Sequence, residues 1–159
     1  MRRSLGRICT TVAVLLALAS CADSPRRAEE LAPAPPGDRI ASLAQALVGS
    51  PYRFGGAEPA GFDCSGLVFF VHHELGISVP RTAAEQSLAA TPVDPADLEP
   101  GDVVFFRDPG PQATHVGVYI GEHRFVHAPK SGRPVSYASL QDDYYRATFL
   151  GAGRFYAEP

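Results

Sequence analysis

Three residues in this chain carry side chains suited to acyl-transfer chemistry. Cys64 stands in the run GFDCSGLVFF, and His115 and His127 stand in two later apolar runs, HVGVYI and RFVHA. A thiol becomes a good nucleophile when its pKa falls, as it does at a helix N-terminus beside an imidazolium. A histidine acting as the base needs a second polar group to fix its tautomer and orientation. These residues could therefore supply a nucleophile, a base and an orienting group.

The same three side chains could instead bind zinc and leave a fourth position open, as in some catalytic zinc sites. Against zinc, Cys64 lacks the short local ligand pair of structural sites, and the chain contains no HExxH motif. Residue types and spacing favour the nucleophile, and they leave a zinc hydrolase open as the alternative.

A helix running from Cys64 to about Leu75 would place the thiol at its first turn. Asp63 is a natural N-cap and Gly76 a natural C-terminal stop. Steps of 100° per residue put an apolar stripe on the same side as the sulfur, made of Leu67, Val68, Val71 and Leu75. Two further histidines, His72 and His73, are predicted to be solvated on this helix, and His123 to lie in a hairpin loop.

Hairpin geometry brings His115 and His127 together. If residues 121–123 form the loop, Ile120 faces Arg124 and His127 lies opposite Gly117, with His115 its diagonal neighbour on the same face. A shift of one residue in the register would put the two rings on opposite faces. Gly117 is expected to leave room for another element to approach.

The order of patterns predicts an α+β domain, with helices first and an antiparallel sheet later. Helical periodicity covers residues 38–49, a short helix or turn is expected within 80–90, and a loop within 91–102. Alternating or apolar runs predict five strands, at 103–106, 115–120, 124–128, 134–138 and 149–155.

The N-terminus has the pattern of an export signal. Basic residues precede a largely apolar stretch of twelve residues, too few to span a membrane, and the segment ends in LASC. This ending looks like a bacterial lipobox, in which Cys21 would carry a lipid; the alternative is an ordinary signal cut near Ala19 or Ala22. We expect a signal peptide over 1–20, a lipidated cysteine and disordered tether over 21–37, and one domain over 38–159.

Cysteine and charge counts narrow the function further. Of the three cysteines, Cys9 leaves with the signal and Cys21 is acylated, so Cys64 has no disulfide partner in an exported chain and is flagged as reactive. Removal of three N-terminal arginines leaves 11 basic and 17 acidic residues, a net charge of about −6. The chain has no excess of basic residues that could bind phosphates, so nucleic acid is not an expected partner.

The runs VGSPYRFGG, GFDCSGLVFF, ISVPRTAAEQ, LEPGDVVFF and THVGVYIGEHRFVHAP together resemble the NlpC-type family of bacterial cell-wall cysteine peptidases. The resemblance covers residues 39–156 and implies a papain-like core, with the cysteine helix packed on an antiparallel sheet of about five strands. It implies Cys64 as nucleophile, His115 as general base and His127 as the residue that orients it. Substrate-binding roles are implied for Tyr52, Asp63 and Ser65, and no cofactor or metal is implied.

The implied reaction is hydrolysis of an amide in peptidoglycan stem peptides through a thioester. The two favoured candidate bonds are γ-D-glutamyl–diaminopimelate and the D-alanyl–diaminopimelate cross-link, with the glycan–peptide amide as a less favoured third. Asp63 could meet an amine of the substrate. We expect an exported monomer that is lipid-anchored on the periplasmic face of the cell envelope, with the outer membrane favoured over the inner. Besides the zinc amidase, a catalytically inactive lipoprotein that binds wall peptides is an alternative.

Overall fold

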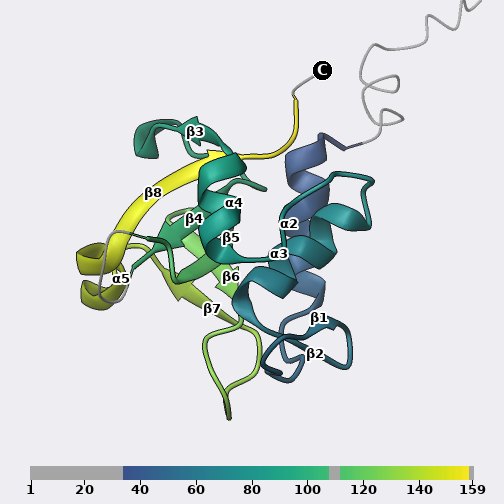
Figure 1. The fold of residues 1–159 in the computed structure, drawn as a ribbon. Coiled ribbons are helices and arrows are strands. Elements are labelled where there is room, and N and C mark those ends of the chain that lie inside the picture. Colours follow the sequence, from purple (N-terminus) through teal and green to yellow (C-terminus); the bar gives the residue numbers. More distant parts are fainter. Residues whose placement is uncertain (1–33, 108–111, 158–159) are drawn as a thin grey trace, which may run out of the picture. The chain divides into compact units, whose positions relative to one another are not determined.

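The computed structural model describes residues 34–107 and 112–157 of the chain, in which helices pack on an antiparallel sheet in an α+β arrangement (Figure 1). The predicted signal peptide, Cys21 and most of the predicted tether lie outside these residues. The helices are α2 (Pro36–Ala46), α3 (Cys64–His73), α4 (Ala83–Ala89), the 3-10 helix η1 (Pro95–Asp97) and α5 (Asp143–Thr148). Within the described residues, no helix is long and apolar enough to cross a membrane.

An antiparallel sheet, with strands of different lengths, forms the second layer. In spatial order its strands are β3 (Thr91–Val93), β8 (Phe149–Arg154), β4 (Val103–Phe106), β5 (His115–Gly121), β6 (Arg124–His127) and β7 (Ser136–Ser139). A separate small hairpin pairs β1 (Ala57–Glu58) with β2 (Gly61–Phe62) just before α3. All five predicted strands are present: the one at 103–106 has the predicted bounds, the other four have shifted ends, and β3 adds a sixth at the edge of the sheet.

The first helix begins earlier than predicted. Its N-terminal residue is Pro36, so Pro36 and Gly37 belong to α2 and not to the tether. Proline suits this position because its missing N–H would have no partner in the first turn of a helix. Ile40 and Ala44 are fully buried, which confirms the apolar stripe expected from the sequence.

Helix α3 is the central support of the cysteine. It starts at Cys64 with Asp63 as its N-cap, as predicted, and Leu67, Val68 and Val71 are fully buried below it. The helix ends at His73, and Gly76 follows with a positive φ of 75° that allows the chain to turn away.

The prediction of a solvated His72 was wrong. This side chain is fully buried, because it lies beside the edge of the Phe155 ring from the end of β8. Its Nδ1 donates to the Val68 carbonyl at 2.8 Å, and its buried Nε2 has no hydrogen-bond partner among the residues that the structure describes. The helical projection missed this contact because it shows only the helix itself and not the C-terminal segment that covers its other side.

The segment that follows α3 also differs from the prediction. Helix α4 starts with a capping box, in which Thr82 and Glu85 satisfy each other's backbone N–H groups. The predicted loop over residues 91–102 contains β3 and η1. In the described ranges, strand β3 pairs with β8 alone, and as an edge strand it tolerates Pro92.

The β5–β6 hairpin brings the histidines together, although its turn differs from the prediction. Val118 pairs with Val126 and Tyr119 with Phe125, which is the expected register. Gly121, not Ile120, then pairs with Arg124, and an irregularity between Tyr119 and Gly121 absorbs the extra residue. The turn is therefore the two residues Glu122 and His123, both with positive φ, and His123 is exposed as predicted.

The sheet has a hydrophobic cluster on each face. Helices α2, α3 and α4 cover one face through residues that include Ile40, Leu67 and Ala83, packed on Val103, Val116 and Val126. The other face holds a smaller cluster around Phe106 and Phe125, with Tyr145 of α5 packed against it. Helix α5 was not predicted, because DDYYRAT has no apolar period; it is held by this tertiary contact.

Candidate active site

Cys64 is half-buried at the first residue of α3, where the helix meets the start of β5. Burial raises the pKa of its thiol, and the nearby Asp63 carboxylate adds to the rise. Hydrogen bonds from the backbone N–H groups of Ser65, Val116 and Cys64 itself oppose it without cancelling it. Since Val116 directly follows His115, the contact with its N–H places the sulfur beside the first residue of β5.

His115 and His127 are joined by a hydrogen bond of 2.7 Å between Nε2 of His115 and Nδ1 of His127. Tyr145, from α5, lies beyond them with its hydroxyl 3.3 Å from Nε2 of His127. One consistent tautomer set has Nε2–H of His115 donating to His127, and Nε2–H of His127 donating to Tyr145. In this set Nδ1 of His115 keeps a free lone pair, which is the form a general base needs.

Burial keeps both rings neutral. It lowers the pKa of His115 to about 4, and burial together with the neighbouring His115 lowers the pKa of His127 to about 3. With the thiol pKa raised and the imidazole pKa lowered, the resting state is a thiol beside a neutral imidazole. Such a pair activates the sulfur by proton transfer during the reaction, and not by a preformed ion pair.

Gly117 lies between the two histidine positions. It was expected to leave room for another element, but the structure shows a different reason for a glycine there. A Cβ at this position would lie 2.5 Å from Cδ2 of Phe125 and 3.0 Å from the Val126 carbonyl oxygen. The ring of Phe125 on the neighbouring strand, not a separate element, therefore occupies the space over Gly117. The glycine lets β5 and β6 approach closely where they present the two histidines.

Asp63 is the most highly connected side chain next to the cysteine. Its Oδ1 accepts from the Gly66 N–H at 2.6 Å, and its Oδ2 accepts from the Gly55 N–H at 2.9 Å. Arg81 donates to both oxygens, at 2.9 and 2.7 Å. Burial raises the pKa of this carboxyl, but the hydrogen bonds from Arg81 and Gly66 outweigh burial and hold the pKa below its usual value.

This network bears on the predicted role of Asp63. The N-cap prediction is confirmed. The prediction that Asp63 meets a substrate amine is not tested, but four internal donors already occupy most of the acceptor positions of a carboxylate. The structure thus gives Asp63 a clear part in holding the first turn of α3.

Two residues of the run PRTAAEQ hold the same turn, and sequence reasoning assigned neither of them a role. Arg81 also donates to Ser65 Oγ at 3.0 Å and to the Gly56 carbonyl at 3.2 Å. Gln86, fully buried, donates from Nε2 to the Ser65 carbonyl at 3.0 Å. The capping-box pattern of Thr82 and Glu85 was the sequence signal that could have located Arg81. It fixes where α4 begins, and Arg81 lies directly before that point.

Tyr52 and Ser65 complete the predicted site residues. Tyr52 is half-buried and pairs with Phe62; burial raises the pKa of its phenol, and the nearby Cys64 and Asp63 contribute. Ser65 is buried, and its hydroxyl lies 3.3 Å from Asp63 Oδ1. The structure therefore brings Tyr52, Asp63 and Ser65 close to Cys64, while their predicted roles toward a substrate stay predictions.

The zinc alternative gains no support from the side-chain geometry. In the part of the chain that the structure describes, no three His, Cys, Asp or Glu side chains are grouped as ligands of one metal ion. His115 and His127 are instead directly hydrogen-bonded to each other.

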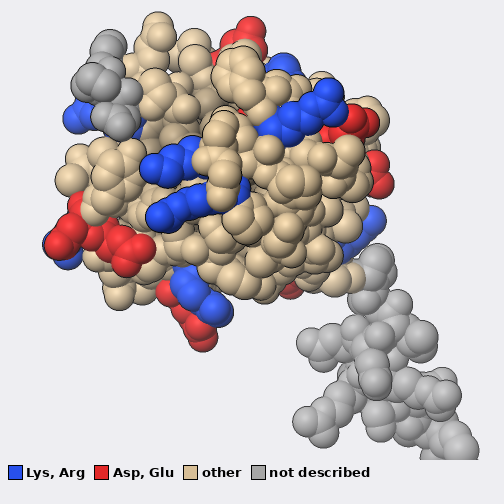
Figure 2. All heavy atoms as spheres, turned by 90° about the horizontal axis from the view of Figure 1, so that it is seen from below, with Lys and Arg blue, Asp and Glu red and all other residues tan. Residues whose placement is uncertain are grey.

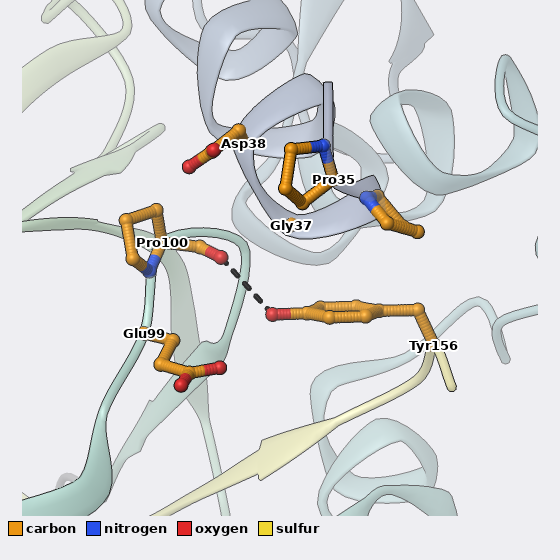
Figure 3. A pocket seen from close by; sticks show the side chains of 7 residues that line it. Pro35, Gly37, Asp38, Glu99, Pro100 and Tyr156 are labelled. Carbon is orange, nitrogen blue, oxygen red and sulfur yellow. Dashed lines mark hydrogen bonds between the residues drawn. The ribbon is translucent and has the colours of Figure 1, made fainter. Parts of the chain in front are cut away.

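Several hollows lie at the surface, and two of them matter for locating the site. One, of about 650 Å³, is beside His115 and includes Lys130 and Tyr144 in its lining. The view from below Figure 1 shows Lys and Arg side chains near the middle of the face to which the β6–β7 loop projects, with Asp and Glu toward its edge (Figure 2). The other, of about 470 Å³, lies at the start of α2, where the Tyr156 hydroxyl donates to the Pro100 carbonyl at 3.0 Å (Figure 3). It contains none of the predicted site residues.

Comparison with known proteins agrees with this geometry. Residues 49–154 match the NlpC/P60 family. The chain belongs to the NlpC/P60 family. It is 44% identical over 112 residues to the murein DD-endopeptidase MepH of Escherichia coli, an alignment that covers 67% of this chain and 41% of that protein.

Solved NlpC/P60 structures share the fold. A family member from Bacillus cereus superposes with a TM-score of 0.72 at 31% identity, over 75% of this chain and 40% of that one. The NlpC/p60 domain of the peptidoglycan hydrolase SagA superposes with a TM-score of 0.65 at 30% identity, over 74% of this chain and 97% of that one. The present chain thus spans about two fifths of the length of MepH and nearly all of the isolated SagA domain.

Proposed function

We propose that this protein is a peptidoglycan hydrolase, a cysteine endopeptidase that cleaves amide bonds in stem peptides. The observation that carries the proposal is the hydrogen-bonded pair of His115 and His127 at the strand ends beside Cys64. Membership of a family whose relatives include a murein endopeptidase and a peptidoglycan hydrolase supports the same reaction class.

The proposed reaction assigns one part to each of the three side chains. Nδ1 of His115 accepts the thiol proton of Cys64 as the sulfur attacks the carbonyl carbon of the scissile amide. The backbone N–H of Cys64, at the N-terminus of α3, stabilises the negative oxygen of the tetrahedral intermediate. His115 then gives its proton to the departing amine, which leaves a thioester on Cys64. Water attacks the thioester with His115 again as base, and the free thiol returns.

His127 and Tyr145 orient the base. In these tautomers, Nε2–H of His115 donates to Nδ1 of His127 at 2.7 Å. The lone pair on Nδ1 of His115 therefore points away from His127. When His115 takes up the proton, the same hydrogen bond becomes charge-assisted and stronger. This arrangement predicts that kcat/KM falls on the acid side as His115 becomes protonated, near its lowered pKa of about 4.

The two candidate bonds share one feature. Both γ-D-glutamyl–diaminopimelate and the D-alanyl–diaminopimelate cross-link place diaminopimelate on the amine side of the bond that breaks. Tyr52 and Ser65 are proposed to contact the acyl side, since both lie next to Cys64 on the α3 side.

We also propose that the chain is exported and anchored by a lipid on Cys21. The support is the sequence LASC after a short apolar run. Phase partitioning of cell extracts with a detergent tests it: the wild-type protein should enter the detergent phase, and a Cys21→Ala variant should not. Recovery of both proteins in the aqueous phase would refute the anchor.

The proposed activity is tested with purified muropeptides. Incubation with the wild-type enzyme should release fragments whose masses identify the cleaved amide, and Cys64→Ala should release none while keeping the thermal unfolding midpoint. Iodoacetamide should abolish the wild-type activity, and a chelator should leave it unchanged. Full cleavage by Cys64→Ala, or no cleavage by the wild type, would refute the proposal.

A further inference from the structure

The hollow beside His115 has a cationic wall. It encloses about 650 Å³, and Lys130 and Arg133 line it together with Thr114, Pro129, Tyr144 and Tyr145. Both cations belong to the β6–β7 loop, in which the Arg133 N–H donates to the Lys130 carbonyl at 3.1 Å. This turn holds the two residues close together, directly after His127 and Ala128 in the chain.

Neither cation has an acidic partner among the described residues. The residues that line the hollow include no Asp or Glu, and Lys130 and Arg133 form no ion pair in the part of the chain that the structure covers. Several other arginines are paired with carboxylates: Arg53, Arg81, Arg124, Arg146 and Arg154. Two neighbouring positive charges without a counter-charge favour an anion between them.

The direction of proton transfer shows which part of a substrate reaches this hollow. His115 must deliver its proton to the departing nitrogen, so the amine side of the scissile bond lies on the His115 side of the sulfur. The hollow is lined by His115 and not by Tyr52, Asp63 or Ser65. It is therefore placed to take the residue that carries the leaving amine.

We propose that Lys130 and Arg133 form a subsite for a free carboxylate on the amine-side residue of the substrate. This inference rests on the proposed peptidase function. For both candidate bonds the amine-side residue is diaminopimelate, which has two carboxyl groups and keeps at least one of them free when the other is in amide linkage. A guanidinium and an ammonium group bind a carboxylate more strongly than the neutral carboxamide of nearly the same shape.

The test uses two forms of whichever stem peptide the enzyme cleaves, differing only in a free carboxylate or a carboxamide on diaminopimelate. We expect the wild type to prefer the carboxylate form by about tenfold in kcat/KM at low ionic strength, the upper end of what two exposed charge pairs contribute together. Lys130→Gln with Arg133→Gln should remove this preference by slowing cleavage of the carboxylate form only. Arg39→Gln, an exposed arginine on α2, is the matched control and should keep the wild-type ratio.

The outcomes separate the subsite from the activity. A wild type that shows no preference, or a double variant that keeps it or loses both substrates equally, would overturn the subsite while leaving the peptidase intact. A wild type that cleaves neither form would overturn the proposed function and the subsite with it. Added salt should reduce the wild-type preference and leave the double variant unchanged, because the exposed charges are screened.

Discussion

The ion pair between Arg81 and Asp63 is the contact that most directly supports the first turn of α3, and Arg81→Met removes it with little change in side-chain length. Asp63 is 13% exposed and Arg81 35% exposed. Breaking a fully buried pair costs about 3–5 kcal/mol, and an exposed pair contributes about 0.2–1 kcal/mol. Asp63 keeps its bonds from Gly66 and Gly55 in the variant. An intermediate loss of about 2 kcal/mol in the free energy of unfolding is therefore expected at pH 7.

Thermal unfolding followed by circular dichroism measures this loss. For a domain of this size, about 2 kcal/mol corresponds to a decrease of about 8 °C in Tm. The pKa of Asp63 is lowered in the folded state, so its contribution is present above the unfolded pKa of about 4 and is lost as pH falls through the folded pKa. Arg81→Met weakens that lowering, so the Tm difference from wild type should narrow below about pH 4.

Arg53→Met is the matched control. Arg53 pairs with Glu58 at 3.4 Å, and both side chains are more than 60% exposed, at 63% and 64%. Its loss should change the free energy of unfolding by less than about 0.5 kcal/mol. If Arg81→Met destabilises the protein no more than Arg53→Met, or if its Tm difference from wild type stays constant with pH, the ion pair with Arg81 does not support the first turn of α3 through Asp63.

Three further variants test other parts of the structure. His72→Phe should make the free energy of unfolding fall less steeply as the pH is lowered below about 6.5. Burial lowers the pKa of His72 to about 4, so keeping the ring neutral costs the wild-type protein about 3 kcal/mol at pH 4. Equal acid sensitivity in both proteins would contradict this. Gly117→Ala should lower the free energy of unfolding by about 1–3 kcal/mol and reduce kcat, since its Cβ would lie 2.5 Å from the Phe125 ring. If the variant keeps the wild-type kcat, the spacing of β5 and β6 does not position the histidines. Tyr145→Phe should lower kcat about threefold to tenfold at unchanged KM and Tm, because it removes the acceptor for His127 at 3.3 Å; a change confined to KM would argue for a substrate contact instead.

Local signals in the sequence were sufficient for the cysteine helix and for the hairpin register. Asp63 before an apolar run marked the helix start, and alternation placed His115 and His127 on one face; the structure has both features. The exact turn was missed because Glu122 and His123 adopt positive φ values without the Asn or Gly that usually marks such turns.

Features that depend on distant contacts could not be predicted in the same way. His72 is buried by Phe155, which is more than eighty positions away in the chain, and α5 is held by packing on Phe106 and Phe125. Arg81 reaches Asp63 only because α4 folds back over the start of α3. Each of these depends on tertiary contacts that periodicity within a segment does not contain.

In the proposed reaction, the sulfur of Cys64 carries the acyl group of a stem peptide during cleavage. Acid quenching of the enzyme in the first turnovers with its muropeptide substrate, followed by intact and peptide-level mass spectrometry, tests it directly. We predict a mass increase equal to the acyl-side fragment, mapped to Cys64 and removed by hydroxylamine. Substrate consumption with no adduct on Cys64, together with undiminished turnover by Cys64→Ala, would show that Cys64 is not the nucleophile.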